Sequence, residues 1–331
     1  MIKFFRHIRH SLIQENKTGK YFKYAIGEII LVVIGILIAL QINNWNTNKA
    51  NEKQAYNQLL EVQKEVLNNI VVFDITGTYY FQKLRDVRRV FSDTLTIEDY
   101  QKSRTLRNIM TSSRAILIQN EAFNKLAENA DNLPDQYKPL VVELKNLYNH
   151  SRFKSSSTRL DELQNKYFEF ALEFSESMYR DEYDAVYQFM LTNTGYKNKL
   201  ARYSWTLDDL ASELVDKKYV GITVYNQMVA LGFPNSDNPI LKTMVQEVTP
   251  KLAESFIGNY TNTLDTISIN FKNKEFLGYY SKYNYTGPLR IKDSSSLILY
   301  GTTLEFNADK SEFYFLMDAN QPVFKRTTEN D

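Results

Sequence analysis

The strongest pattern along the chain is one unbroken apolar run near its beginning. Every residue from 29 to 40 is apolar or glycine, and the run extends over residues 24–42 with Glu28 as its one ionisable member. A helix of this length spans about 28 Å, close to the ~30 Å hydrocarbon core of a bilayer. We therefore expect a transmembrane helix over residues 24–43, with a buried helix of a soluble domain as the alternative.

A helical period dominates the next part of the chain, residues 44–245. Apolar residues from Leu59 to Phe73 recur at steps of three and four, which predicts a helix that continues from the transmembrane segment. Thr96 has the pattern of an N-cap because two acidic residues follow it. Turn formers cluster in GFPNSDNP, residues 232–239, the clearest break in the chain. Further helices are expected after Asn120 and over residues 137–148, 158–179, 183–191 and 206–231.

Beyond residue 250 the period changes to short β-rich runs separated by turn formers. Runs at a spacing of about ten residues predict a small antiparallel barrel or sandwich over residues 250–327. The expected strands cover residues 266–271, 276–280, 287–291, 296–300, 303–306, 312–317 and 323–325. The fold class expected is therefore α+β, with a transmembrane helix, a mainly α-helical bundle and this small β domain.

Charge sets the expected orientation of the transmembrane helix. Residues 1–23 carry six Lys and Arg against one acidic residue, Glu15, whereas the three lysines of residues 44–66 are offset by three glutamates. The positive-inside rule then places the N-terminus in the cytoplasm and the bulk of the chain outside. A cleaved signal peptide has a similar basic start, but the run ends in LQINNWN without a small-x-small cleavage pattern, so we expect an uncleaved signal anchor.

Aromatic residues at the two ends of the span are the expected contacts with the lipid bilayer. Tyr21 and Tyr24 mark the cytoplasmic end and Trp45 the outer end, as interfacial aromatic residues do. Glu28 lies about one turn inside the span. One interpretation gives Glu28 a functional role or a role in helix pairing. The other is that its carboxylate extends to the membrane–water interface, and both interpretations remain open.

Small residues recur on one face of the span. Gly27, Gly35 and Ala39 share that face, and Gly35-x-x-x-Ala39 is a small-x-x-x-small pattern that lets two helices approach closely. This pattern predicts a homodimer formed through the transmembrane helix.

Composition excludes several classes of chemistry. A net charge of +1 argues against a nucleic-acid-binding protein. The chain has no cysteine and three histidines, so it lacks disulfides and thiolate metal sites, and we expect no metal and no cofactor. Ser151-Arg152-Phe153-Lys154 fits S-x-x-K, but the one K-T-G lies before the transmembrane segment, so we interpret the match as chance and assign no catalytic residue.

Three further clusters have an ordinary and a functional interpretation. A run of three arginines, Arg85, Arg88 and Arg89, is expected to be a solvated helix face, with partner docking as the alternative. The acid pair Asp208-Asp209 is read as ordinary helix-face charge. Four tyrosines of the β region line a ligand cleft or pack in the core: Tyr279, Tyr280, Tyr283 and Tyr285.

Two stretches resemble known families. GEIILVVIGILIALQINNWN, with the basic MIKFFR start and EAFNKLAENADNLPDQYKPLVVELKNLYNH, resembles a family of uncharacterised single-pass membrane proteins of flavobacteria and related Gram-negative bacteria. The resemblance implies an inner-membrane protein with periplasmic domains and no known activity. Residues 252–326 are similar to the lipocalin-like β domain that follows β-lactamase-type hydrolases, through LAESFIGNY, TISINF, TLEFNAD and VFKR. That domain is accessory in such proteins, so no catalytic residue carries over.

These observations favour a non-enzymatic, membrane-anchored periplasmic protein that binds an envelope protein partner or scaffolds an assembly. The alternative is an envelope sensor that binds a small molecule or peptide in its β domain. A hydrolase is the third hypothesis.

Overall fold

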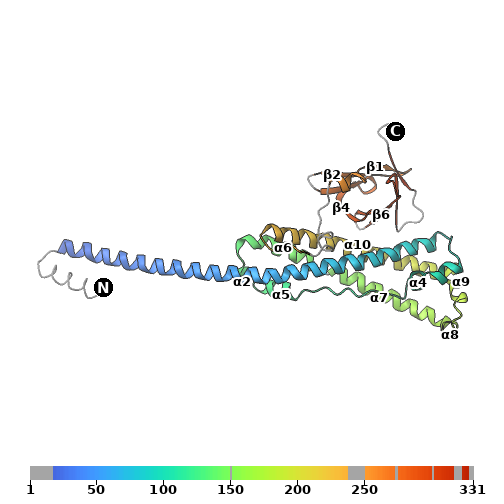
Figure 1. Cartoon of the computed structure of the whole chain (residues 1–331), viewed down its shortest axis with the longest axis horizontal. Coiled ribbons are helices and arrows are strands. Elements are labelled where there is room, and N and C mark those ends of the chain that lie inside the picture. Colours follow the sequence, from blue (N-terminus) through green and yellow to red (C-terminus); the bar gives the residue numbers. More distant parts are fainter. Residues whose placement is uncertain are drawn as a thin grey trace.

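The computed structural model describes residues 18–149, 151–237, 250–272, 275–299, 302–316 and 323–327. Figure 1 shows one long helix that projects as a stalk from a bundle of helices, and a small β-barrel that lies against the side of the bundle. The helical part followed by an antiparallel β domain agrees with the fold class expected from the sequence.

Helix α2 (Thr18–Phe91) runs without a break for 74 residues. Its most apolar window has a mean hydropathy of 2.6 and contains no buried residue, so by length and composition this helix is able to cross a membrane. From Ala55 onward the apolar positions become buried in the bundle, including Leu59, Val66 and Phe73. The predicted continuation of the first helix beyond the apolar run is therefore confirmed.

Helix α10 (Thr194–Ala230) is the antiparallel partner of α2. Asp74 bonds Lys218 at 2.7 Å, which fixes the level at which the two helices meet. The absence of a side chain at Gly221 lets the two helices pack closely there, because a Cβ would lie 2.8 Å from Cγ1 of Ile70. The sequence predicted that this helix starts at residue 206; it starts twelve residues earlier.

Shorter helices cover the rest of the bundle. Thr96 caps the first of them through a reciprocal capping box with Asp99, as its sequence context predicts. The single helix expected over residues 158–179 is wrong in its extent, since a 3₁₀ turn at Leu172–Phe174 interrupts it. The helices are α3 (Ile97–Lys102), α4 (Arg104–Arg107), α5 (Glu121–Glu128), α6 (Lys138–Leu147), α7 (Ser151–Ala171), α8 (Ser175–Tyr179) and α9 (Asp184–Thr192), with 3₁₀ turns at Ala130–Asn132 and Asp135–Tyr137.

A carboxylate of α2 caps the start of α5. The N-cap residue of α5 makes no side-chain capping hydrogen bond. Instead, Glu65 accepts hydrogen bonds from the backbone N–H of Ala122 at 2.8 Å and of Phe123 at 3.2 Å. The hydroxyl of Tyr148 donates to the same carboxylate at 2.7 Å. Glu65 thus satisfies two backbone amide groups that a helix leaves unpaired at its N-terminus.

A short helix, α12 (Pro250–Glu254), leads into eight described strands that form a closed antiparallel barrel. The sequence analysis did not decide between a barrel and a sandwich, and it did not predict the first strand. Pairing of Tyr260 with Arg326 joins that strand to the last one and closes the barrel. The strands are β1 (Gly258–Thr261), β2 (Thr266–Lys272), β3 (Glu275–Tyr280), β4 (Tyr285–Asp293), β5 (Ser296–Leu299), β6 (Thr302–Phe306), β7 (Glu312–Phe315) and β8 (Phe324–Arg326).

Aromatic rings fill the inside of the barrel. Phe313 stacks on Phe324 at 4.8 Å between ring centroids and also contacts Phe306 at 4.9 Å. Phe256, just before the first strand, meets Phe306 edge to face at 5.1 Å. The barrel therefore has its own apolar core, separate from that of the bundle.

Candidate functional site at the barrel docking face

The barrel lies on one face formed by α2 and α10. Phe81, Arg85 and Arg88 are spaced four and three residues apart and therefore point to one side of α2. Asp208 and Tyr219 contribute the α10 half. We call these five residues the docking face.

Arg85 makes the most specific contact of the docking face. Its Nε donates to Oε1 of Glu305 at 3.0 Å, and its Nη2 donates to Oε2 of the same residue at 3.2 Å. Nη2 also donates to the hydroxyl of Ser296 at 3.0 Å, and that hydroxyl donates to Glu305. A two-bond guanidinium–carboxylate pair fixes orientation as well as distance, so this contact sets how the barrel lies on α2.

Arg88 binds the barrel backbone one turn further along α2. Nη1 donates to the carbonyl oxygen of Phe315 at 2.8 Å and of Leu316 at 3.3 Å. Its guanidinium carbon lies 3.7 Å from the ring centroid of Tyr314, a cation–π contact. The expectation of a solvated face is therefore wrong for Arg85 and Arg88. Arg89, the third member, points elsewhere and pairs with Asp86 at 3.3 Å.

Tyr219 links α10 to the barrel. Its hydroxyl donates to the carbonyl oxygen of Ile291 at 2.6 Å. Arg290 stacks over the Tyr219 ring at 5.3 Å, and its Nε lies 3.6 Å from Oδ1 of Asp216. Two apolar barrel residues also join the bundle core, Ile298 and Leu316. The junction is consequently a mixed polar and apolar interface.

Asp208 is a buried carboxyl group within this junction. Its exposed fraction is 8%, and the hydroxyl of Thr303 on β6 donates to it at 3.4 Å. Burial, together with the neighbouring charge of Asp209, raises the pKa of Asp208 to about 7. The sequence interpretation of this pair as ordinary surface charge is wrong for Asp208, which ionises near neutral pH while facing the barrel.

A second buried ionisable group, Lys83, makes hydrogen bonds that connect three parts of the bundle. Its Nζ donates to the carbonyl oxygens of Ile109, at 3.2 Å, and Ser112, and to the hydroxyl of Tyr203 at 3.2 Å. Burial lowers the pKa of Lys83 to about 8. Three acceptors match the three donors of the ammonium group, so Lys83 serves as a link between α2, the segment before α5 and α10.

The structure places the predicted residues of the span on the free part of the stalk. A Cβ at Gly27 or Gly35 would meet nothing within 4 Å, so this face of α2 is open, and Ala39 is exposed. Glu28 is half-buried. Trp45 is 61% exposed, with Nζ of Lys49 lying 5.1 Å from its ring. Tyr21 and Tyr24 belong to the α2 backbone, but their side chains lie outside the described residues.

Three of the four barrel tyrosines come together. Tyr280 pairs across strands with Tyr285, and its ring meets that of Tyr283 at 5.2 Å. Tyr279 alternates to the other face, where its hydroxyl donates to Asn284 at 3.4 Å. Tyr280 belongs to the barrel core, whereas Tyr283 is exposed.

No metal-binding arrangement emerges from the described residues. They contain no group of three or more His, Asp or Glu side chains placed to hold a metal ion. Ser151 and Lys154 lie in the first turn of α7, and their side chains are outside the described part.

Sequence reasoning missed Tyr219 and Glu305 as partners. The available signal on α2 was the three-residue spacing of Arg85 and Arg88, one turn after Phe81, but the residues that the two arginines bind lie more than 200 positions away.

The fold and the docking face together define a helical stalk protein that carries a β-barrel. The model of a family described as "Family of unknown function (DUF6090)" matches residues 28–165. The match covers the apolar part of α2 and continues into α7, leaving α10 and the barrel outside, and it is consistent with the uncharacterised family expected from the sequence. Neither the curated proteins nor the solved structures provide a significant match.

Proposed function

We propose that this protein is a non-enzymatic membrane-anchored interaction protein, which presents its helical bundle and barrel to an envelope protein partner on the periplasmic side. The observation that carries the proposal is the continuity of α2. The same helix is an exposed apolar rod over residues 25–42 and the central helix of the bundle from Ala55 onward. A helix that crosses a membrane and then builds a domain core holds that domain at a fixed distance from the lipid.

The docking face supports a binding role over a catalytic one. Its polar groups are engaged in holding the barrel: Arg85 with Glu305, Arg88 with backbone carbonyls, and Tyr219 with Ile291. Lys83 is likewise surrounded by its hydrogen-bond acceptors inside the bundle. The arrangement gives the bundle and barrel one composite surface with polar and apolar parts, as protein–protein interfaces have.

Thiol labelling tests the anchoring and its orientation. Because the chain has no native cysteine, Asn16→Cys and Thr263→Cys each create a single reporter. Thr263 is exposed between β1 and β2. In cells with a permeabilised outer membrane, an impermeant maleimide should label the Thr263→Cys variant, and should label Asn16→Cys only after detergent is added. Labelling of both variants without detergent, or the reverse pattern, would contradict the proposal.

Site-specific photo-crosslinking tests the interaction. Trp205 on α10 and Val142 on α6 are each 66% exposed, so they form a matched pair of surface positions. Aromatic residues dominate binding hot spots, and Trp205 lies one helical turn before Asp208 on α10. With p-benzoylphenylalanine in place of Trp205 we expect one reproducible heterologous adduct in native membranes, absent when the probe replaces Val142. Adducts with a second copy alone, or equal adducts at both positions, would count against an envelope partner at this surface.

A further inference from the structure

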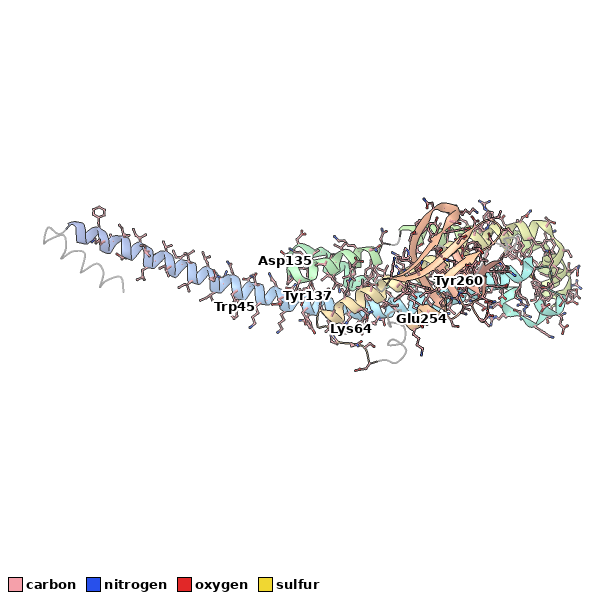
Figure 2. The ribbon with its side chains drawn as sticks, turned by 90° about the horizontal axis from the view of Figure 1, so that it is seen from above. Trp45, Lys64, Asp135, Tyr137, Glu254 and Tyr260 are labelled. Atoms are coloured by element: carbon pink, nitrogen blue, oxygen red, sulfur yellow. The ribbon has the colours of Figure 1, made fainter. Side chains whose placement is uncertain are left out.

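The segment between α4 and α5, residues 112–120, belongs to no helix or strand. Figure 1 shows it as a coil on the side of the bundle away from the barrel. In the view of Figure 2 the barrel, marked by Tyr260, lies toward the viewer, so it does not cover that side. The segment is therefore separate from the docking face.

Two side chains of α2 hold this segment in an extended conformation. The hydroxyl of Tyr80 donates to the carbonyl oxygen of Arg114 at 2.9 Å and accepts from its N–H at 3.3 Å. Asn69 donates to the carbonyl oxygen of Gln119 at 2.7 Å and accepts from its N–H at 2.9 Å. These anchors are eleven residues, or roughly 16 Å, apart on α2 and five residues apart on the segment. The segment thus advances by roughly 3.3 Å per residue, the rise of a β-strand.

Between the two anchors the main chain is unpaired. Residues 115–118 read AILI, and their N–H and C=O groups make no hydrogen bond among the described residues. Ile116 and Ile118 pack against the bundle core, whereas Leu117 between them is 76% exposed. Side chains that alternate between core and solvent are typical of a half-buried strand, and unpaired peptide groups beside them form a free strand edge.

Arg114 adds a positive charge at one end of this edge. Its side chain is exposed and makes no ion pair within the part of the chain that the structure describes. A complementary segment would carry an acidic residue at the end that meets Arg114. Because Arg114 stands at the N-terminal end of the edge, that residue belongs near the C-terminal end of an antiparallel partner strand.

We propose that residues 114–119 form a strand edge, which binds an extended, antiparallel segment of a partner protein by strand addition. The inference rests on the proposed interaction role, which it deepens by naming the kind of segment that the partner supplies. The edge runs along α2, so two copies anchored in one membrane point the same way and pair their edges only in parallel. Parallel pairing is slightly less stable per residue, which favours a different protein over a second copy.

Hydrogen exchange of the full chain in nanodiscs tests the edge. The probe is a capped heptapeptide of alternating threonine and valine that ends in glutamate, and the amides of residues 115–118 are followed by mass spectrometry. We expect fast exchange without the peptide and at least about fivefold slower exchange at a saturating concentration. The same peptide with N-methyl groups on its three central residues lacks the main-chain donors and should have no effect. Slow exchange before addition, no effect of the plain peptide, or equal effects of both peptides would overturn the strand edge.

Two variants separate main-chain pairing from side-chain contact. Leu117→Thr removes the apolar side chain but keeps the N–H, so the affinity for the plain peptide should change by less than about threefold. Loss of binding in this variant would mean that the apolar side chain, and not the main chain, holds the peptide. Moving the glutamate to the first residue of the peptide should weaken binding about two- to fivefold, and Arg114→Gln should make the two peptides equal. Tighter binding of the peptide that starts with glutamate would contradict the antiparallel direction.

Photo-crosslinking in native membranes separates this inference from the proposed function. With p-benzoylphenylalanine in place of Leu117 we expect a heterologous adduct, and adducts with a second copy alone would overturn a different protein as the occupant. A heterologous adduct at Trp205 combined with no effect of the plain peptide refutes strand addition alone. Slowed exchange with the peptide but no heterologous adduct at either position refutes the envelope partner instead.

Discussion

Replacing Glu65 with alanine should lower the free energy of unfolding of the helical bundle by about 3 to 5 kcal/mol. The carboxylate is 6% exposed and accepts three hydrogen bonds, two from the first turn of α5 and one from Tyr148. Truncation leaves buried donors without an acceptor, each at a cost of about 1 to 3 kcal/mol. It also removes negative charge from a helix N-terminus. Urea unfolding of the full chain in detergent micelles, followed by circular dichroism, measures the change.

Two further variants serve as controls for the unfolding measurement on Glu65→Ala. Glu61→Ala on the same helix removes an exposed carboxylate that pairs with Lys64 at 2.7 Å, and it should change stability by less than about 1 kcal/mol. Glu65→Gln keeps one acceptor oxygen and should fall between the two. If Glu65→Ala unfolds at the same urea concentration as Glu61→Ala, the capping of α5 from α2 does not contribute to stability.

Replacing Asp208 with asparagine should make the protein more stable, and the gain should grow with pH. The folded protein holds the pKa of Asp208 at about 7, against an ordinary value of 3.8. The folded state therefore binds the proton more tightly, so the contribution of protonated Asp208 to stability is complete below about pH 4 and is lost as the pH rises through about 7. Asparagine keeps the shape without ionising. Its advantage over aspartate should increase by about 2 to 3 kcal/mol between pH 5 and pH 8.

Unfolding midpoints at pH 5, 6.5 and 8 would reveal this trend. Asp131→Asn is the control, because Asp131 is exposed on the bundle far along the sequence from the docking face, and its substitution should give the same small change at every pH. A constant difference between Asp208→Asn and the natural chain across this pH range would mean that Asp208 is not buried against the barrel.

The sequence predicts elements well where the burial pattern is local. The stripe from Leu59 to Phe73 and the capping signal at Thr96 both depend on neighbours within a few residues, and both are confirmed. The start of α10 was missed because its first turns are polar. There the buried residues are widely spaced tyrosines, Tyr196 and Tyr203, around Leu200, and no dense apolar stripe marks them.

What the sequence leaves undetermined depends on distant parts of the chain. The first strand of the barrel is four residues long with one buried side chain, Tyr260, and it becomes recognisable only through its pairing with β2 and β8. The charges of Arg85 and Asp208 likewise look like surface features until the barrel covers them. Whether a charged helix face is solvated or buried depends on contacts with residues far along the chain. The spacing of charges on the helix does not reveal which residues those are.

Because α2 is unbroken, a tilt at one end of the helix displaces its other end. Between residue 43, at the end of the apolar run, and Arg85, where the barrel is fastened, the helix extends for roughly 60 Å. Transmembrane helices commonly tilt by about 20°, and a tilt of half that amount would swing the barrel sideways by roughly 10 Å. If the apolar run is anchored in a bilayer as proposed, a small change in bilayer thickness or in the packing of the span would produce a large displacement at the far end of the helix. The Arg85–Glu305 contact makes the barrel follow this movement, so in the proposed anchored arrangement a tilt of the span would change the position of the barrel.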